Sequence, residues 1–279
     1  MYTRWSPELT RLLHPSNGTK SIRKGNLEYY VLPSRVQDCL LSIASDIDNV
    51  IEKGCIQKYE DNSTASLFSV QEETFFGKHV RFHQKSFDRR LRYFIQPSRS
   101  FWTAVVANRM QNADIPTPCV YAVAERRSCH LLSDSYVITE ALDNALMLHT
   151  VVSRSPNNIE YLKKASRLLR LLHNAGITHG DAKLANFYVQ DETMGFWDLD
   201  SALIFSGPVP TKYVIRDIGR LLSSYIVTVD ECPESDPEFM NTKKISEALA
   251  NAYGIDVQVF LPFYNSYWLK KIKLQHDFG

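Results

Sequence analysis

A long amphipathic helix followed by a short polar segment restricts the folds open to this chain most strongly. In residues 157–176, NNIEYLKKASRLLRLLHNAG, apolar side chains recur at helical spacing (positions 159, 162, 165, 168, 169 and 172), and Gly176 follows as a C-cap. The segment ITHGDAKLANFYV (177–189) comes next, and GFWDLD (195–200) lies a few residues further on. We expect FYV and GFW to form a hairpin closed by QDETM, preceded by a polar loop.

The residues before this helix favour a β-rich region. The expected elements are an amphipathic helix at 35–54 that ends at Gly54, an antiparallel meander of three strands (55–59, 66–70 and 75–82), a helix at 101–113, and two further strands within 114–127 and 135–142. Strands therefore come first and helices later. This order predicts a small β-rich lobe followed by a larger, mainly helical lobe, an α+β organisation.

The composition limits the class of protein. A chain of 279 residues with 44% hydrophobic content can bury a full core. A formal net charge of +1 argues against a dedicated nucleic-acid binder. The five cysteines are scattered without metal-ligand spacing, which indicates free thiols in a reducing compartment. We see no apolar region typical of a signal peptide and no apolar run of membrane-spanning length, so we expect a soluble, cytosolic protein.

The polar loop and the hairpin together suggest a site for phosphoryl transfer. A hairpin through QDETM can bring Asn186, at the start of one strand, beside Asp198, at the end of the other. An amide oxygen and a carboxylate are suitable ligands for Mg²⁺, which usually completes its shell with substrate phosphates. Asp181 would then accept a proton from an attacking hydroxyl, and Lys183 would neutralise charge on the transferred group.

This arrangement of residues resembles a known family. Asp-x-Lys-x-x-Asn after His-x, with a second Asp about a dozen residues later, is similar to the catalytic loop and metal-binding Asp of the protein-kinase-like fold. Gly180, where protein kinases usually carry Arg, looks more like kinases of small molecules and sugars. The chain most resembles bacterial lipopolysaccharide core kinases, which phosphorylate Kdo or heptose. The likeness covers roughly residues 65–225, and it is strongest in the catalytic loop.

The resemblance implies a two-lobed protein-kinase-like fold. An N-terminal extension with the β-rich N-lobe would occupy residues 1–140, and the helical C-lobe with the catalytic loop residues 141–279. ATP and Mg²⁺ would be the cofactors. Asp181 would be the catalytic base and Lys183 the phosphate-contacting lysine, whereas Asn186 and Asp198 would hold the metal.

Further roles follow from the same resemblance. Asp217 matches a helix aspartate that braces the catalytic loop through its backbone amides. Backbone groups from Glu140 to Leu142 would form the hinge that meets adenine. Asp200 stands where protein kinases have the glycine of their DFG motif, and the resemblance implies that it would contact a second metal. We expect His179 to support the loop through hydrogen bonds rather than to take part in catalysis.

Two features of the N-lobe depart from the family pattern. The candidate phosphate-binding turn, EDNSTAS at 60–66, has no glycine. The family spacing places the ATP-contacting lysine near Val80; Lys78 would share its strand face, and Lys85 is the other candidate. The helix at 101–113 has no glutamate to pair with such a lysine, and Asn108 is a weak substitute. A catalytically impaired pseudokinase that acts as a binding module is therefore an alternative to an active kinase.

The acceptor expected from the resemblance is a sugar or glycolipid of the lipopolysaccharide inner core. A kinase of another small molecule, such as an aminoglycoside- or choline-like amine, is the alternative within enzymes. Basic residues predominate in 78–99, with only one acid among them (Lys78, Arg81, Lys85, Arg89, Arg90, Arg92 and Arg99 against Asp88). The tail YWLKKIKLQH (267–276) is also basic. Such segments are usually solvated faces, but they also suit peripheral contact with the inner face of the inner membrane.

Simpler interpretations remain for individual residues. Asp181, Lys183 and Asn186 are types that are common in turns, although their combination with Asp198 favours a functional site. His79 and His83 lie four residues apart but have no third ligand nearby, so we expect packing or solvated roles rather than metal binding.

Overall fold

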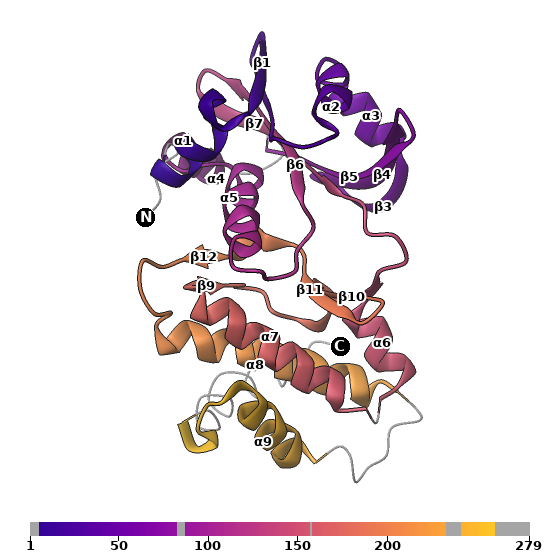
Figure 1. The fold of residues 1–279 in the computed structure, drawn as a ribbon, viewed down its shortest axis with the longest axis vertical. Coiled ribbons are helices and arrows are strands. Elements are labelled where there is room, and N and C mark those ends of the chain that lie inside the picture. Colours follow the sequence, from indigo (N-terminus) through magenta and orange to yellow (C-terminus); the bar gives the residue numbers. More distant parts are fainter. Residues whose placement is uncertain (1–5, 83–86, 157, 233–240, 260–279) are drawn as a thin grey trace. The chain divides into compact units, whose positions relative to one another are not determined.

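The computed structural model describes residues 6–82, 87–156, 158–232 and 241–259 (Figure 1). The chain divides into two compact units: residues 1–109 with 118–142, and residues 110–117 with 143–279. All five cysteines lie within the described residues and all are free. None of the helices in the described ranges is long and apolar enough to cross a membrane.

Within the described residues, the first unit is built on a seven-stranded antiparallel sheet (Figure 1). Its strands are β1 (Lys20–Lys24), β2 (Leu27–Val31), β3 (Cys55–Glu60), β4 (Ser63–Val70), β5 (Glu73–Arg81), β6 (Val120–Ser128) and β7 (Leu131–Glu140), in the order β1-β2-β6-β7-β5-β4-β3. The predicted β3-β4-β5 meander and the two later strands are confirmed. The β1–β2 hairpin was not predicted, because β1 is exposed and half-exposed along its length and so shows no apolar alternation.

The helices of the first unit depart from prediction most clearly at residues 35–54. They are α1 (Pro7–Leu13), η1 (Pro15–Asn17), α2 (Gln37–Ser42), α3 (Ile47–Lys53), α4 (Phe87–Ile95) and α5 (Arg99–Gln111), the last of which ends in the second unit. Helices α1 and α4 were not predicted. The single helix expected at 35–54 is wrong: it is two helices, α2 and α3. The Ser42 hydroxyl donates to the Cys39 carbonyl at 2.6 Å, and the Asp46 amide bonds to Ile43 in a separate turn, which ends the first helix.

The two faces of this sheet are covered by different helices. On one face, α2 and α3 pack on a core that includes Tyr29, Tyr136 and Ile138. Gly77 permits this approach, because a Cβ there would lie 2.7 Å from the Phe68 ring and 2.9 Å from Ile51. On the other face, Phe101 of α5 meets Tyr30 edge to face.

The second unit is mainly helical in its described part. Its elements are β8 (Leu146–Met147), α6 (Leu148–Arg154), α7 (Glu160–Asn174), β9 (Ile177–Thr178), η2 (Leu184–Asn186), β10 (Phe187–Gln190), β11 (Thr193–Phe196), η3 (Leu199–Ser201), β12 (Leu203–Ile204), α8 (Thr211–Asp230) and α9 (Thr242–Tyr253). The predicted long helix is confirmed as α7, and Gly176 follows with a φ of 73°. The predicted hairpin is confirmed as β10–β11.

Candidate active site

The segment between β9 and β10 is a loop whose path depends on a glycine. Gly180 has a φ of 80°, and a Cβ at this position would overlap the carbonyl oxygen of Ser201. Strand β9 also pairs with β12, which places Thr178 opposite Leu203. The loop that carries Asp181 is therefore pressed against the segment that follows Asp198, and only glycine fits at 180.

The carboxylate of Asp217 on α8 binds the backbone of this loop through hydrogen bonds. Asp217 is fully buried. It accepts hydrogen bonds from the backbone amides of His179, at 2.8 Å, and Gly180, at 3.0 Å. The His173 Nε2 atom lies 3.2 Å from the same carboxylate. The predicted bracing contact is confirmed, and its charge-assisted bonds fix the backbone immediately before Asp181.

His179 connects the same loop to the DLD segment. Its Nδ1 accepts from the Asp181 amide at 3.3 Å, so its Nε2 carries the proton and donates to the Trp197 carbonyl at 3.1 Å. Burial lowers the pKa of His179, which keeps the ring neutral, although the nearby Asp217 carboxylate acts in the opposite direction. The expected supporting role is confirmed, because both ring nitrogens are used within the protein.

Three of the predicted residues meet in this loop. The Asn186 Nδ2 donates to the backbone carbonyl of Asp181 at 2.8 Å and to its Oδ2 at 3.1 Å. The Lys183 Nζ lies 3.4 Å from the same Oδ2. The amide nitrogen of Asn186 is thus committed to Asp181, which leaves its oxygen as the atom able to bind a cation.

The β10–β11 hairpin brings the residue before Asp198 into backbone contact with Asn186. Phe187 pairs with Phe196, and the Trp197 amide donates to the Asn186 carbonyl at 3.2 Å. Asp198 follows at once in the left-handed conformation, with φ 56° and ψ 61°, a strained backbone for a non-glycine residue. Asp200 lies in the short helix η3 that begins there.

An amide oxygen and a carboxylate fit the preference of Mg²⁺ for hard oxygen ligands. In the described ranges no three His, Cys, Asp or Glu side chains gather as a metal site. A magnesium ion held by Asn186 and Asp198 would take phosphate and water oxygens as its other ligands, because Mg²⁺ prefers octahedral coordination.

Sequence reasoning missed a third partner of Asp181. Arg220 lies on α8 one turn after Asp217, and its Nη1 forms an ion pair with Asp181 Oδ1. Arg216 lies one turn before Arg220 on the same helix. Its Nε is 3.9 Å from Asp217, and its guanidinium is 5.1 Å from the centre of the Tyr213 ring. The signal was present in RDIGR, because positions three apart share a helix face.

Three residues of the first unit were predicted to contact ATP: Lys78, Glu140 and Leu142. Lys78 pairs with Val137 across the β5–β7 ladder, on the face opposite His79, and is half-buried. The Glu140 amide donates to the Cys119 carbonyl at 2.8 Å, and its carboxylate accepts from the Cys119 amide at 3.2 Å. The amide of Glu140 is therefore already used. Leu142 is the last residue of this unit. Lys85 lies outside the described residues.

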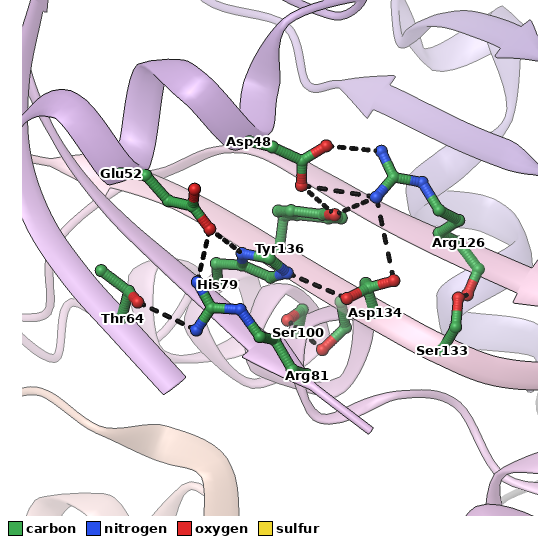
Figure 2. Close-up of polar contacts among 11 residues, drawn as sticks. Asp48, Glu52, Thr64, His79, Arg81, Ser100, Arg126, Ser133, Asp134 and Tyr136 are labelled. Carbon is green, nitrogen blue, oxygen red and sulfur yellow. Dashed lines mark hydrogen bonds and ion pairs between the residues drawn. The ribbon is translucent and has the colours of Figure 1, made fainter. Parts of the chain in front are cut away.

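His79 belongs to a polar network on the α3 side of the sheet (Figure 2). Its Nε2 lies 3.0 Å from Asp134, and its ring stacks on Tyr136 at 4.4 Å. The Tyr136 hydroxyl donates to Asp48 at 2.6 Å, and Arg126 pairs with the same carboxylate at 2.7 Å. The expected packing role of His79 is confirmed, since this network joins α3 to three strands; His83 lies outside the described residues.

Burial and charge act against each other in this network. Burial would raise the pKa of Asp48, but hydrogen bonds from Arg126 and Tyr136 together with the Arg126 charge lower it overall. For Asp134, burial is likewise outweighed by its bond to His79, and its pKa is lowered. Burial raises the pKa of Tyr136. Asp48 and Asp134 are therefore ionised near neutral pH. Asp48 is the ion-pair partner of Arg126, and Asp134 is the hydrogen-bond partner of His79.

The fold and the loop define a class of protein. An antiparallel sheet followed by a helical unit, with Asp181, Lys183 and Asn186 in a loop braced from α8, is the arrangement of the protein-kinase-like fold. A solved structure of WaaP in complex with acyl carrier protein matches with a TM-score of 0.54 and 18% identity, over 82% of this chain and 92% of that one. At this identity the match shows the fold alone.

The family follows from the sequence comparison. The model of the lipopolysaccharide kinase (Kdo/WaaP) family matches residues 61–237, and the chain belongs to this family. A 3-deoxy-D-manno-octulosonic acid kinase of Vibrio cholerae serotype O1 is 26% identical over 106 residues. That match covers 38% of this chain and 44% of the relative, so the chain matches less than half of the length of this curated relative.

Proposed function

We propose that this protein transfers the γ-phosphate of ATP, with Mg²⁺, to a hydroxyl of a lipopolysaccharide inner-core sugar, either Kdo or heptose. The observation that carries the proposal is the loop around Asp181. Its backbone is fixed by Asp217, and its carboxylate is contacted by Asn186, Lys183 and Arg220. Family membership supports the reaction class, and the Kdo kinase relative supports the choice of acceptor.

Asp181 performs the central step in this proposal. Its carboxylate orients the acceptor hydroxyl and accepts the proton as the oxygen attacks the γ-phosphorus, while the bond from that phosphorus to the β–γ bridging oxygen breaks and ADP leaves. Lys183 stabilises the charge spread over the transferring oxygens. Asn186 and Asp198 would hold a magnesium ion, which would neutralise the phosphate charge when bound.

The surroundings of Asp181 favour an anionic acceptor over a cationic one. Lys183 and Arg220 both pair with its carboxylate. Two cations beside the base repel an amine-bearing acceptor and attract an acidic sugar. This charge distribution argues against the aminoglycoside- or choline-like alternative.

One observation favours the pseudokinase alternative. Strands β3 and β4 are joined by a two-residue turn, Asp61–Asn62, in place of a glycine-rich phosphate loop. The Asn62 carbonyl already accepts from the Arg81 amide at 2.8 Å. Lys78 remains the proposed ATP lysine, with Glu140 and Leu142 as the proposed hinge. If none of these binds ATP, the protein is a binding module.

A transfer assay distinguishes these functions. The full chain would be incubated with labelled ATP, Mg²⁺ and either deacylated core oligosaccharide or an aminoglycoside, and product masses measured. We expect one added phosphate on the oligosaccharide only. Transfer to the amine alone would overturn the acceptor assignment. An unchanged melting temperature with Mg²⁺-ATP, together with no transfer, would establish the pseudokinase. Because ATP is required, we propose that the reaction takes place in the cytoplasm, at the inner face of the inner membrane.

A further inference from the structure

Helix α4 is attached to the sheet of the first unit along one side. Tyr93 is buried and meets Phe82 edge to face at 4.9 Å, in a cluster with Val80 and Leu132. The Arg127 Nη1 donates to the Tyr93 carbonyl and to the His130 carbonyl, each at 3.0 Å. These contacts fix the helix to the β6–β7 turn and determine which of its sides faces outward.

The outward side of α4 is apolar. Leu91, Phe94 and Ile95 are 50%, 54% and 59% exposed, and their spacing of three and four places them together on one side of the helix. Single exposed apolar residues need no explanation, but a cluster of large ones marks an interaction surface. Among the described residues, α4 is the helix with the most such side chains. Leu91, Phe94 and Ile95 are called the α4 patch below.

Positive charge accompanies this apolar patch. The sequence of α4, FDRRLRYFI, contains three arginines and one aspartate, and Arg92 is exposed between Leu91 and Tyr93. Arg99, just beyond the helix, is also exposed and lies 3.3 Å from the Tyr93 hydroxyl through its Nε. An amphipathic helix with arginines beside Leu and Phe is the kind that lies in the interface of a membrane with anionic lipids.

We propose that α4 binds the surface of an anionic phospholipid bilayer. The α4 patch enters the boundary between headgroups and acyl chains, and Arg92 pairs with lipid phosphates. A second copy of this chain is a poorer occupant, because a symmetric contact through the α4 patch would bring the exposed Arg92 of both copies together. The choice of a bilayer also rests on the proposed function, since a glycolipid acceptor resides in one.

Vesicle flotation tests the proposal without ATP or acceptor. The full chain would be mixed with phosphatidylcholine vesicles, or with vesicles containing phosphatidylglycerol and cardiolipin. We expect flotation only with the anionic vesicles and release as salt is raised. The double substitution Phe94→Ser and Ile95→Ser should weaken binding by about tenfold or more, and Arg92→Gln by about fivefold.

Matched control variants distinguish vesicle binding by the α4 patch from non-specific binding by any exposed apolar residue. Ile56→Ser changes an apolar residue of the same unit that is 50% exposed, and Leu171→Ser changes one on α7 that is 52% exposed. Neither should alter flotation. A Phe94→Trp variant adds a direct probe, because its emission should shift to the blue with anionic vesicles, whereas that of Ile56→Trp should not.

Each outcome decides the proposal. Equal flotation of the Phe94→Ser, Ile95→Ser variant and the unmodified chain would overturn it. So would a dimer in light scattering that this variant dissociates, combined with no vesicle binding. Phosphate transfer to deacylated oligosaccharide should be unchanged in the α4 variants, since that acceptor needs no bilayer. If the unmodified chain transfers no phosphate to the oligosaccharide, this result would count against the proposed function and not against membrane binding by α4.

Discussion

Arg220 forms an ion pair with the carboxylate of Asp181, one helical turn beyond Asp217, whose own carboxylate binds the loop that carries Asp181. Helix α8 therefore holds both the backbone and the side chain of the proposed base. This relationship makes Arg220 a positioning residue for the proposed base.

Replacing Arg220 should affect turnover more than binding. Arg220→Gln removes the charge that orients Asp181, so kcat should fall by roughly tenfold or more while the KM for ATP changes little. Arg220→Lys keeps a charge without the planar fork and should recover part of the rate. Steady-state kinetics would measure both. Arg167→Gln, an exposed arginine on α7, is the control, and an unchanged kcat in Arg220→Gln would contradict the assignment.

Asp217 should contribute mainly to stability. In Asp217→Asn one carboxylate oxygen becomes an NH₂ group that faces the amides of His179 and Gly180. Leaving these buried donors without a full set of acceptors should cost about 2–4 kcal/mol of unfolding free energy, measured by urea denaturation. Asp230→Asn, at an exposed position of the same helix, should cost almost nothing. Equal losses in the two variants would show that the brace is unimportant.

Gly180 should tolerate no side chain. Gly180→Ala combines a φ of 80° with a Cβ that overlaps the Ser201 carbonyl, so the loop must shift and transfer should fall at least about a hundredfold. Gly207→Ala is the matched control, because a Cβ there meets nothing within 4 Å. The control variant should keep full activity; normal activity in Gly180→Ala would mean that the loop geometry does not affect transfer.

His179 should make stability depend on pH. Burial lowers its pKa in the folded protein below the ordinary value of 6.5, so below that pH the unfolded chain binds more protons than the folded one. Stability from this group is therefore complete above about pH 6.5 and decreases as the pH falls. Melting temperatures between pH 8 and pH 5 should fall less steeply in His179→Gln than in the unmodified protein. Identical slopes would count against a neutral buried ring.

Much of the second unit could be predicted from sequence, because its signals are local. Helix α7, the β10–β11 hairpin, and the meeting of Asp181, Lys183 and Asn186 all depend on residues close together in the chain. The ion pair of Arg220 depends on how α8 packs against the loop, which spacing alone does not reveal. The sequence nevertheless indicates that Arg220 lies on the same face of the helix as Asp217, because the two residues are three positions apart.

The first unit was harder to predict. The break between α2 and α3 arises from the Ser42 side chain bonding to the backbone, in competition with an apolar pattern that runs through both helices. Strand β1 has no buried face to give it a period. The Glu140 side chain turns back to Cys119, 21 residues away, a contact that no local pattern encodes.

The most direct test of the account compares Asp181→Asn and Asp198→Asn in nucleotide binding and transfer. Asp181→Asn should keep the thermal shift with Mg²⁺-ATP while transfer to deacylated core oligosaccharide falls by roughly a thousandfold, because the base is lost but the metal ligands remain. Asp198→Asn should weaken the thermal shift as well. Transfer by Asp181→Asn at the unmodified rate would contradict the claim that Asp181 is the catalytic base.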